Sequence, residues 1–404
     1  MKIFRPHPSP VSDDPLPVID HKAYVTLSEE EKKLYRPVNS QYEKLPRICI
    51  VFYALALVSL ILYISFCLSP AFADFFNLHI SAVGRTFLHL LTSPLPFSLG
   101  EACIWLLPLI LVLALVYAVS KRCDTWKSAL SYLGILLSVI ALVFSMFTLN
   151  FAAGYRGTGL DQKLGLEQKP VDASALYETA DMLRKQINRE SANIAYTEDG
   201  FSVMPYSLEE MNRKLNAAYR DFCDHHDFIT HVDSRVKPVL ASEAMSYLHI
   251  TGVYTFFTGE ANINVQFPDY TIPYTAAHEM AHQRGIARED EANFVAFLIC
   301  ASSDDAYIRY SGYVNLYEYL VSALADADYN RFALVHSQLS YLVQGEMSAY
   351  NRFFATYEDS KSSEISETVN NGFLQSQGTP GTVSYGMVVD LAVAYFQESP
   401  ENHG

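Results

Sequence analysis

Apolar residues are concentrated in the first part of this 404-residue chain. Three apolar runs cover about 47–69, 103–120 and 130–150, and after Arg47 none of them contains a charged residue. Because about 20 apolar residues cross a hydrocarbon core about 30 Å thick, each run predicts a transmembrane helix. A buried core helix is the alternative for each run, and three runs of this length together disfavour it.

Positive residues beside the runs predict the orientation of the chain. Basic side chains precede the first run and occupy the short turn between the second and third runs: Lys44, Arg47, Lys121, Arg122 and Lys127. Since cytoplasmic loops are enriched in Lys and Arg, we expect both groups and the N-terminus in the cytoplasm. The loop 70–102 and everything after Asn150 then lie outside the cytoplasm.

The same pattern divides the chain into three expected parts. These are a cytoplasmic tail over 1–46, a transmembrane region over 47–152 and an extracytoplasmic domain over 153–404. A long polar stretch precedes the first apolar run, so this run is expected to be an uncleaved anchor in a cell-membrane protein. Within the outer loop, residues 75–91 predict an interfacial amphipathic helix, and His79 and His89 are expected to be polar residues at that interface.

The remaining residues predict a mostly helical domain with a small sheet. Apolar residues recur with a helical period over 173–189, and a second helix is expected over 206–222. Two short strands are expected over 252–257 and 261–265, separated by a glycine. The expected fold class is therefore a mainly α membrane protein whose three N-terminal transmembrane helices are followed by an α+β external domain.

The strongest chemical signal is the segment His278-Glu279-Met280-Ala281-His282. On a helix, residues four positions apart share one face, so both imidazoles can bind one tetrahedral zinc ion. Glu279 is rotated about 100° from His278, where its carboxylate can contact a metal-activated water without binding the metal. Gly285 suits a left-handed helix C-terminus, which turns the chain back toward the metal.

The next segment, 287–298, supplies a candidate third ligand. If it is helical, Glu289 lies on one stripe with small or polar residues, so this helix can approach the first one closely. Glu289 would complete a His₂Glu zinc site, and Asn293 could orient a ligating histidine from behind. Glu291 lies on the opposite side of the helix and is the less favoured ligand; a helix-cap carboxylate is the alternative role for Glu289.

These motifs resemble a known class of enzymes. His278-Glu279-x-x-His282 followed by Glu289-x-x-Ala292-Asn293 resembles the gluzincin type of zincin metallopeptidases. That resemblance implies a zincin-like external domain in which Glu279 is the general base and Glu289 the third ligand.

The chain also resembles a family of bacterial multi-pass membrane proteins catalogued as a domain of unknown function, number 3810. The resemblance runs from the membrane helices to Tyr395. It includes the segments Pro96–Gly100, Gly259–Asn262, His278–Asn293, Tyr310–Tyr313 and Ser384–Gly386. It implies an architecture and a site but no substrate.

Further residues are candidates for the oxyanion donor and the substrate-binding strand of such a site. Peptide hydrolysis needs a donor to the developing oxyanion, and Tyr385 is preferred over Tyr310 and Tyr313 because a glycine follows it. Each tyrosine has a packing role as its alternative. The strand containing Asn262 and Asn264 is expected to be the edge strand that pairs with an extended substrate, or else an ordinary sheet strand.

Composition limits the class of partner that we expect the chain to bind. The formal net charge of −15 disfavours nucleic acid, which is bound through Lys and Arg. Cys223 and Cys300 are the only cysteines in the external domain, and whether they pair stays open. We therefore expect a membrane-anchored hydrolase with one Zn²⁺ per chain, acting on a peptide or protein outside the cytoplasm. The alternatives are a zinc-binding sensor or assembly protein without turnover, and a hydrolase of a non-peptide envelope amide.

Overall fold

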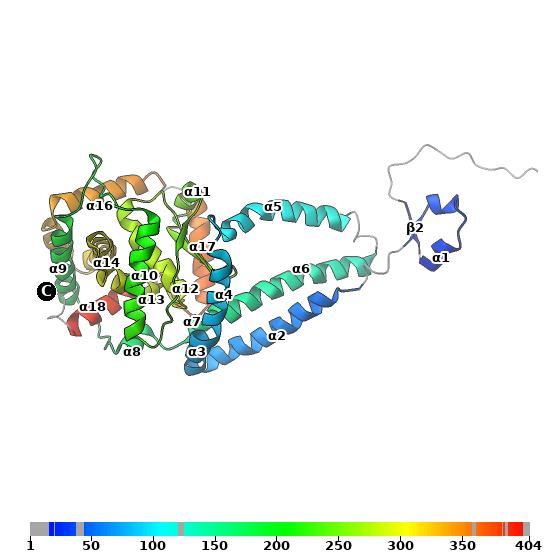
Figure 1. The fold of residues 1–404 in the computed structure, drawn as a ribbon, viewed down its shortest axis with the longest axis horizontal. Coiled ribbons are helices and arrows are strands. Elements are labelled where there is room, and N and C mark those ends of the chain that lie inside the picture. Colours follow the sequence, from blue (N-terminus) through cyan, green and yellow to red (C-terminus); the bar gives the residue numbers. More distant parts are fainter. Residues whose placement is uncertain are drawn as a thin grey trace, which may run out of the picture. The chain divides into compact units, whose positions relative to one another are not determined.

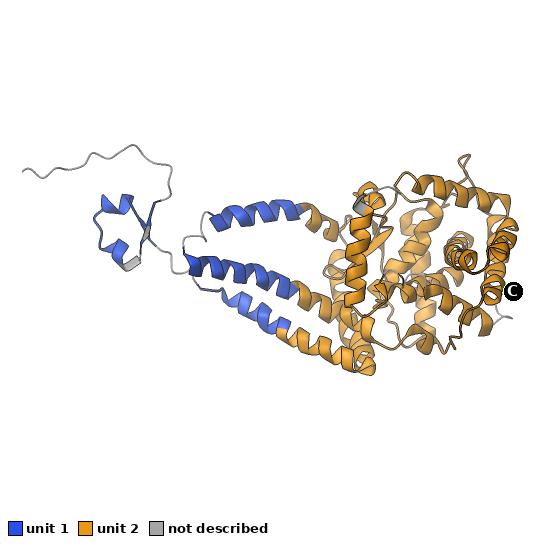
Figure 2. Ribbon diagram, turned by 180° about the vertical axis from the view of Figure 1, so that it is seen from behind, with its two compact units in different colours: residues 1–56, 106–142 blue, residues 57–105, 143–404 orange. Residues whose placement is uncertain are grey.

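A computed structural model describes residues 16–19, 21–37, 44–119, 125–357, 361–381, 383 and 387–398. The chain divides into two compact units, which Figure 2 distinguishes by colour. Unit 1 comprises residues 1–56 and 106–142, and unit 2 comprises residues 57–105 and 143–404. The helices that cross from one unit to the other are described below by their bounds.

Within the described part of the chain, three helices are long and apolar enough to cross a membrane, as the sequence predicted. They are α2 (Arg47–Leu68), α5 (Leu99–Tyr117) and a third helix over Trp126–Arg156. The third comprises α6 (Trp126–Phe147), the π-turn η5 (Thr148–Ala152) and α7 (Ala153–Arg156), with no break between them.

Unit 1 also contains a small N-terminal element. Strands β1 (Val18–Ile19) and β2 (Arg36–Pro37) pair in parallel, and α1 (His21–Val25) and the 3₁₀ turn η1 (Glu31–Lys33) lie between them in sequence. Among its membrane-length segments, the hydroxyl of Tyr53 donates to the carbonyl of Gly134 at 2.6 Å. The unit therefore joins its helices partly through tyrosine-to-backbone hydrogen bonds.

The expected outer loop is largely helical and belongs to unit 2. It begins with α3 (Pro70–Phe76), continues through the π-turn η3 (Asn77–Ser81) and ends with α4 (Ala82–Thr92). Ser69 caps the start by accepting the N–H of Phe72, and Pro70 occupies the first turn, where no backbone donor is needed. We call this continuous segment, residues 70–92, the surface helix.

A three-stranded sheet lies next to the motif helix in unit 2. Its strands are β3 (Val236–Pro238), β4 (Gly252–Thr255) and β5 (Glu260–Ile263), in the order β3-β5-β4. The two expected strands are confirmed as β4 and β5. The expected edge position of β5 is wrong, because β5 pairs in parallel with β3 on one side and antiparallel with β4 on the other.

Helices form the rest of unit 2. The motif helix α12 (Ile272–Gln283) and its successor α13 (Glu289–Ala301) lie in the interior (Figure 1), and nearly all of their residues are buried. They pack with α14 (Ala306–Ala327), which also packs along α9 (Ala173–Ser191). Asp172 and Asp305 cap α9 and α14.

Shorter or outer helices complete this unit. They are α8 (Leu160–Leu164), α10 (Leu208–His225), α11 (Ser242–Tyr247), the 3₁₀ turn η6 (Asp269–Thr271), α15 (Tyr329–Ser337), α16 (Tyr341–Phe354), α17 (Lys361–Ser376) and α18 (Val388–Glu398). The expected helices over 173–189 and 206–222 are thereby confirmed as α9 and α10. Cys223 and Cys300 are free.

Candidate metal centre

The motif helix ends in a tight turn that brings α13 back over it. Gly285 has φ +96°, a left-handed conformation that favours glycine, as the sequence predicted. The N–H of Ile286 bonds to the carbonyl of Ala281, so the chain reverses at once. The following helix then starts with Glu289, whose side chain lies above the two motif histidines.

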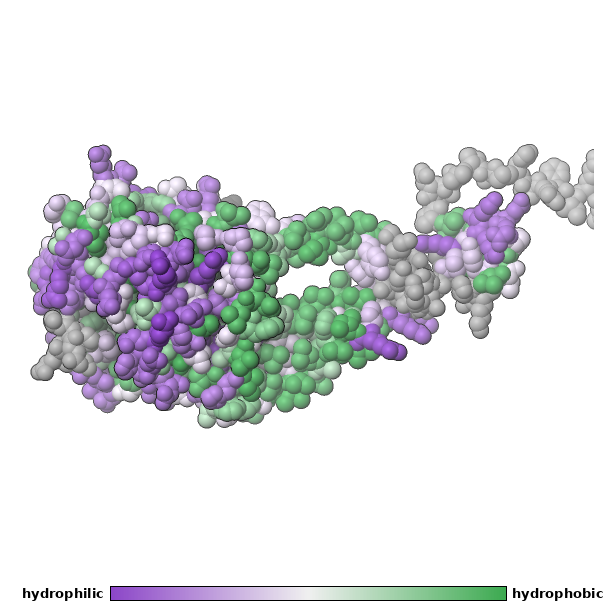
Figure 3. Space-filling model, in the orientation of Figure 1, coloured by the Kyte–Doolittle hydropathy of each residue, from purple (hydrophilic) through white to green (hydrophobic). Residues whose placement is uncertain are grey.

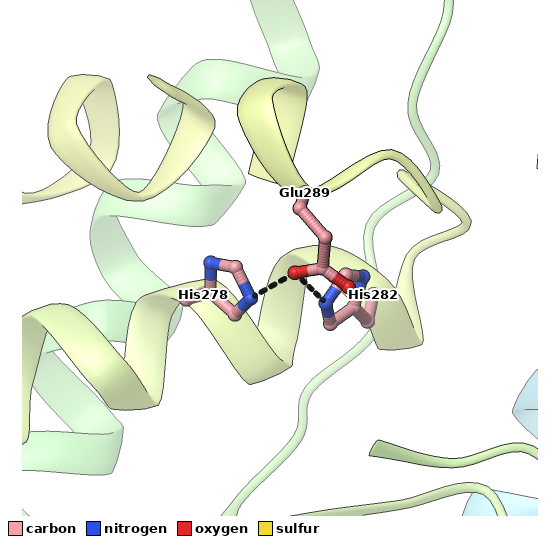
Figure 4. Close-up of side chains that lie close together, drawn as sticks. All are labelled: His278, His282 and Glu289. Carbon is pink, nitrogen blue, oxygen red and sulfur yellow. Dashed lines mark ion pairs between the residues drawn. The ribbon is translucent and has the colours of Figure 1, made fainter. Parts of the chain in front are cut away.

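Figure 4 shows that His278, His282 and Glu289 converge on one point. One carboxylate oxygen of Glu289 lies 3.2 Å from Nε2 of His278 and 3.5 Å from Nε2 of His282. Within the described residues, the three donor atoms all lie within 4.8 Å of one another. Glu291 is elsewhere: it accepts hydrogen bonds from the N–H of Leu160 and from Arg288.

This donor set fits a zinc ion. With zinc–ligand distances of about 2.0–2.2 Å, two ligands of a tetrahedral site lie about 3.3–3.5 Å apart. The observed separations of 3.2 Å and 3.5 Å fall close to that range. Two imidazoles and one carboxylate are also the ligand types of catalytic zinc sites, which keep a fourth position open.

The second nitrogen of each histidine matters for metal binding. Nδ1 of His282 lies 2.7 Å from the carbonyl oxygen of Ile286, so Nδ1 donates to that carbonyl and Nε2 is the nitrogen that faces Glu289 and could bind a metal ion. Nδ1 of His278 is buried and has no hydrogen-bond partner in the described part of the chain. Burial and His282 lower the pKa of His278, and nearby Asn293 partly opposes this, which is compatible with the positioning role expected for Asn293.

Glu279 is buried against strand β4. Its Oε2 has no hydrogen-bond partner among the described residues, so a polar atom is left for a water molecule or a substrate. Gly252 at the start of β4 lies directly against this side chain: a Cβ there would be 2.6 Å from Oε1 and 2.7 Å from Cγ. The carboxylate is therefore fixed in place by close packing on one side.

Burial sets the protonation of the cluster. Burial, with a contribution from Glu289, raises the pKa of Glu279 to about 8 although His282 opposes it. Burial lowers the pKa of His278, and the neighbouring His282 lowers it further. Burial opposes charge on His282 and Glu289 as well, but their mutual attraction outweighs it. The pKa of His282 therefore rises to about 9, and that of Glu289 falls well below its usual range.

Of the expected oxyanion donors, Tyr310 is not part of this cluster. The hydroxyl of Tyr310 donates to Glu346 and accepts from the hydroxyl of Tyr196 at 3.2 Å. The hydrogen bonds of Tyr310 are therefore made to a separate group of buried polar side chains. Tyr385 lies outside the described residues. For Tyr310 the structure favours the packing role.

The expected substrate strand also has a different role. The amide of Asn262 donates to the carbonyls of Val253 and Glu260, and that of Asn264 donates to Ile250 and Ser246. Both side chains are almost fully buried. Because β5 is the central strand, these asparagines tie the sheet together and are not exposed to an extended peptide.

Three residues near the cluster were not predicted. Tyr319 in α14 lies with its hydroxyl 3.4 Å from the amide nitrogen of Asn293. Burial, aided by Glu318 and Glu289, raises the pKa of Tyr319 to about 12. Phe151 in η5 presents its ring to His282 with centroids 5.8 Å apart. Gly252 is the third. Each lies far from the motif in sequence, so no local spacing could have indicated it.

The described residues thus define a mainly helical protein with three membrane-length helices and a buried His₂Glu cluster. Residues 76–393 match the family described as "Protein of unknown function (DUF3810)", and the chain belongs to this family. No curated protein and no solved structure matches the chain.

Proposed function

We propose that this protein is a zinc-dependent hydrolase of peptide bonds, with His278, His282 and Glu289 as ligands and Glu279 as general base. The observation that carries the proposal is the convergence of three ligand atoms within 4.8 Å beside a buried, unpaired carboxylate. A structural zinc site would have no use for such a carboxylate, and structural sites are usually closed and rich in cysteine.

The chemistry divides between the ion and the chain. A zinc ion held here would polarise the scissile carbonyl and lower the pKa of an attacking water. Glu279 accepts the proton of that water at its free Oε2 and passes it to the leaving amine.

Tyr319 is the best-placed donor for the developing oxyanion. Its raised pKa keeps the phenol protonated at neutral pH, so the hydroxyl can donate a hydrogen bond. Its contact with Asn293 places it on the Glu289 side of the cluster. It therefore replaces Tyr310 as our candidate for this role among the described residues.

Strand β4 replaces β5 as the candidate substrate strand. Asn264 N–H bonds to the carbonyl of Thr251, so the alternation of an antiparallel pair directs the peptide groups of Gly252 and Tyr254 away from β5. Within the described sheet no strand pairs with that side of β4. An extended peptide added there would pass Glu279, which lies against Gly252.

The test combines metal content with hydrolysis. We expect the purified full chain to contain about one zinc, Glu279→Gln to retain it, and His278→Ala to lose it. Wild type should cleave members of a mixed peptide library, with products read by mass spectrometry, and Glu279→Gln should not. A wild type without bound metal, or equal cleavage by wild type and Glu279→Gln, would overturn the proposal. Zinc without cleavage of any peptide would favour the sensor or assembly role.

A further inference from the structure

The surface helix exposes an apolar face. Its large exposed residues are apolar and lie along one stripe: Phe75, Ile80, Val83, Phe87, Leu90 and Leu91. One exposed polar side chain, His79, lies among them. Val83 is 67 % exposed and Leu90 is 63 % exposed. Exposing such a stripe to water costs about 25 cal/mol of free energy for each Å² of apolar surface.

The opposite face of the same helix is polar and buried. Its buried polar side chains are Asn77, Ser81, Arg85, His89 and Thr92. A helix on the surface of a soluble protein has the reverse arrangement, with its apolar stripe toward the core. The expected interfacial position of His89 is therefore wrong: its Nε2 bonds to the carbonyl of Asp233 at 2.9 Å inside the protein.

The buried polar face holds the turn that closes the metal centre. Asn77 donates to the carbonyl of Gly285 at 2.9 Å, and Arg85 donates to the carbonyl of Arg284 at 3.3 Å. The amide of Gln283 donates to Nδ1 of His89 at 3.0 Å. Three successive residues after the second motif histidine are thus bonded to the surface helix.

The third membrane-length helix contacts the same turn. Its residue Phe151 packs against the ring of His282, and Arg85 also donates to the carbonyl of Asn150 at 2.8 Å. Gly154 is so close to the turn that a Cβ there would lie 2.6 Å from the carbonyl oxygen of Gly285. The metal centre is therefore packed directly on the end of a membrane-length helix.

We infer that the apolar stripe of the surface helix lies in the lipid bilayer and holds the metal centre at the membrane surface, so that the substrates are polypeptides attached to the same membrane. The substrate class rests on the proposed function; the membrane position does not. Lipid is the occupant because the helix follows α2 after one residue and precedes α5, and both are membrane-length helices.

Charge agrees with a lipid environment. The guanidinium of Arg85 and the carboxylate of Asp74 point away from the stripe: Arg85 is buried, and Asp74 pairs with Lys163 at 2.9 Å. The exposed imidazole of His79 packs against the ring of Phe75, with centroids 4.9 Å apart. In Figure 3 hydrophobic residues cover the side of unit 2 where α3 and α4 lie, whereas hydrophilic residues cover α9 and α10. An apolar face rimmed by such residues fits hydrocarbon better than water.

The membrane position can be tested by tryptophan fluorescence in liposomes. The two natural tryptophans, Trp105 and Trp126, are replaced by phenylalanine, and the full chain then receives either Phe87→Trp or Tyr341→Trp. Both sites are exposed aromatic positions, 59 % and 82 %, so the substitutions are matched. We expect brominated phosphatidylcholine to quench the first and aqueous iodide to quench the second.

Two results would overturn the membrane position. Iodide quenching of Phe87→Trp equal to that of Tyr341→Trp would show that the stripe faces water. Protection from both quenchers, with a dimer seen by cross-linking, would show that a second copy covers it. Neither reading requires metal or catalysis.

The substrate class is tested with one cleavable peptide in two forms. The peptide is supplied free or joined to a lipid chain in the same liposomes, and we expect kcat/KM for the anchored form to be higher by on the order of 100-fold, because attachment raises its effective concentration. Equal values would overturn the inferred substrate class and leave the hydrolase intact. Cleavage of neither form by zinc-loaded protein would overturn the proposed function, and the substrate class with it, while the quenching result stands.

Discussion

Gly252 and Glu279 are in direct contact, and a methyl group on Gly252 would overlap both Oε1 and Cγ of the glutamate. Gly252→Ala must therefore displace the proposed general base while leaving the three ligands in place. We expect at least a tenfold loss of kcat, on the order of a 1.4 kcal/mol higher barrier, with unchanged zinc content. Gly345→Ala is the matched control, since a Cβ at Gly345 meets nothing within 4 Å. Normal hydrolysis by Gly252→Ala would contradict the role of Glu279.

The two glutamates of the first turn of α13 give a test of the third ligand. Glu289→Gln should weaken zinc binding by more than the roughly 10–100-fold that loss of an outer-shell partner costs, because it removes an anionic ligand. Glu291→Gln makes the same replacement of a carboxylate by an amide but affects only the contacts with Leu160 and Arg288. Zinc affinity is measured by competition with a chelator. Equal losses in both variants would remove Glu289 from the ligand set.

Comparing Tyr319→Phe with Tyr310→Phe distinguishes a hydroxyl that acts in the proposed hydrolysis from one that has a packing role. Tyr319→Phe should lower kcat by on the order of 100-fold with little change in KM, as expected for loss of one oxyanion donor. Tyr310→Phe should leave kcat near the wild-type value and lower the melting temperature, because it removes the donor to Oε2 of the buried Glu346, whose Oε1 keeps its bonds from Ser202. The reverse pattern would restore Tyr310 as the donor.

Glu318 makes stability depend on pH. Burial, aided by Glu346, raises its pKa to about 7 although Tyr270 donates to it at 3.2 Å. The folded chain therefore binds a proton that the unfolded chain releases near the ordinary pKa of 4.5. The resulting stabilisation is present below pH 4.5 and is lost as pH rises from there to about 7.

This loss amounts to about 3 kcal/mol at most, because one pKa unit corresponds to about 1.4 kcal/mol. Glu318→Gln cannot ionise, so its melting temperature should change less between pH 5 and pH 8 than that of wild type. The measurement is thermal unfolding in detergent at the two pH values. A parallel pH response in both proteins would show that Glu318 is not the group responsible.

The parts of the site that follow from local periodicity were predictable. His278 and His282 lie four positions apart on one helix, and Gly285 marks where that helix turns back. Glu289 follows from the same helical spacing, applied to the next segment. The three apolar runs were equally clear, since composition alone defines a membrane-length helix.

The parts that depend on tertiary packing were not predictable. Strand order illustrates this: β3 precedes β4 and β5 in sequence but pairs with β5, which places β5 in the centre and leaves β4 at the edge. The contacts of Gly252 with Glu279 and of Phe151 with His282 join segments far apart in the chain. For residues 75–91 the amphipathic pattern was visible, but the sequence could not show which face is buried.

The third membrane-length helix continues without a break through the π-turn at Thr148–Ala152. A protease that severed the chain after Ala152 would separate Phe151 from His282 and Arg85 from the carbonyl of Arg284. The released fragment would begin at Ala153 without the wall of its own metal centre. Cleavage there should therefore disrupt the candidate metal centre, and we expect the released fragment to lack the proposed activity.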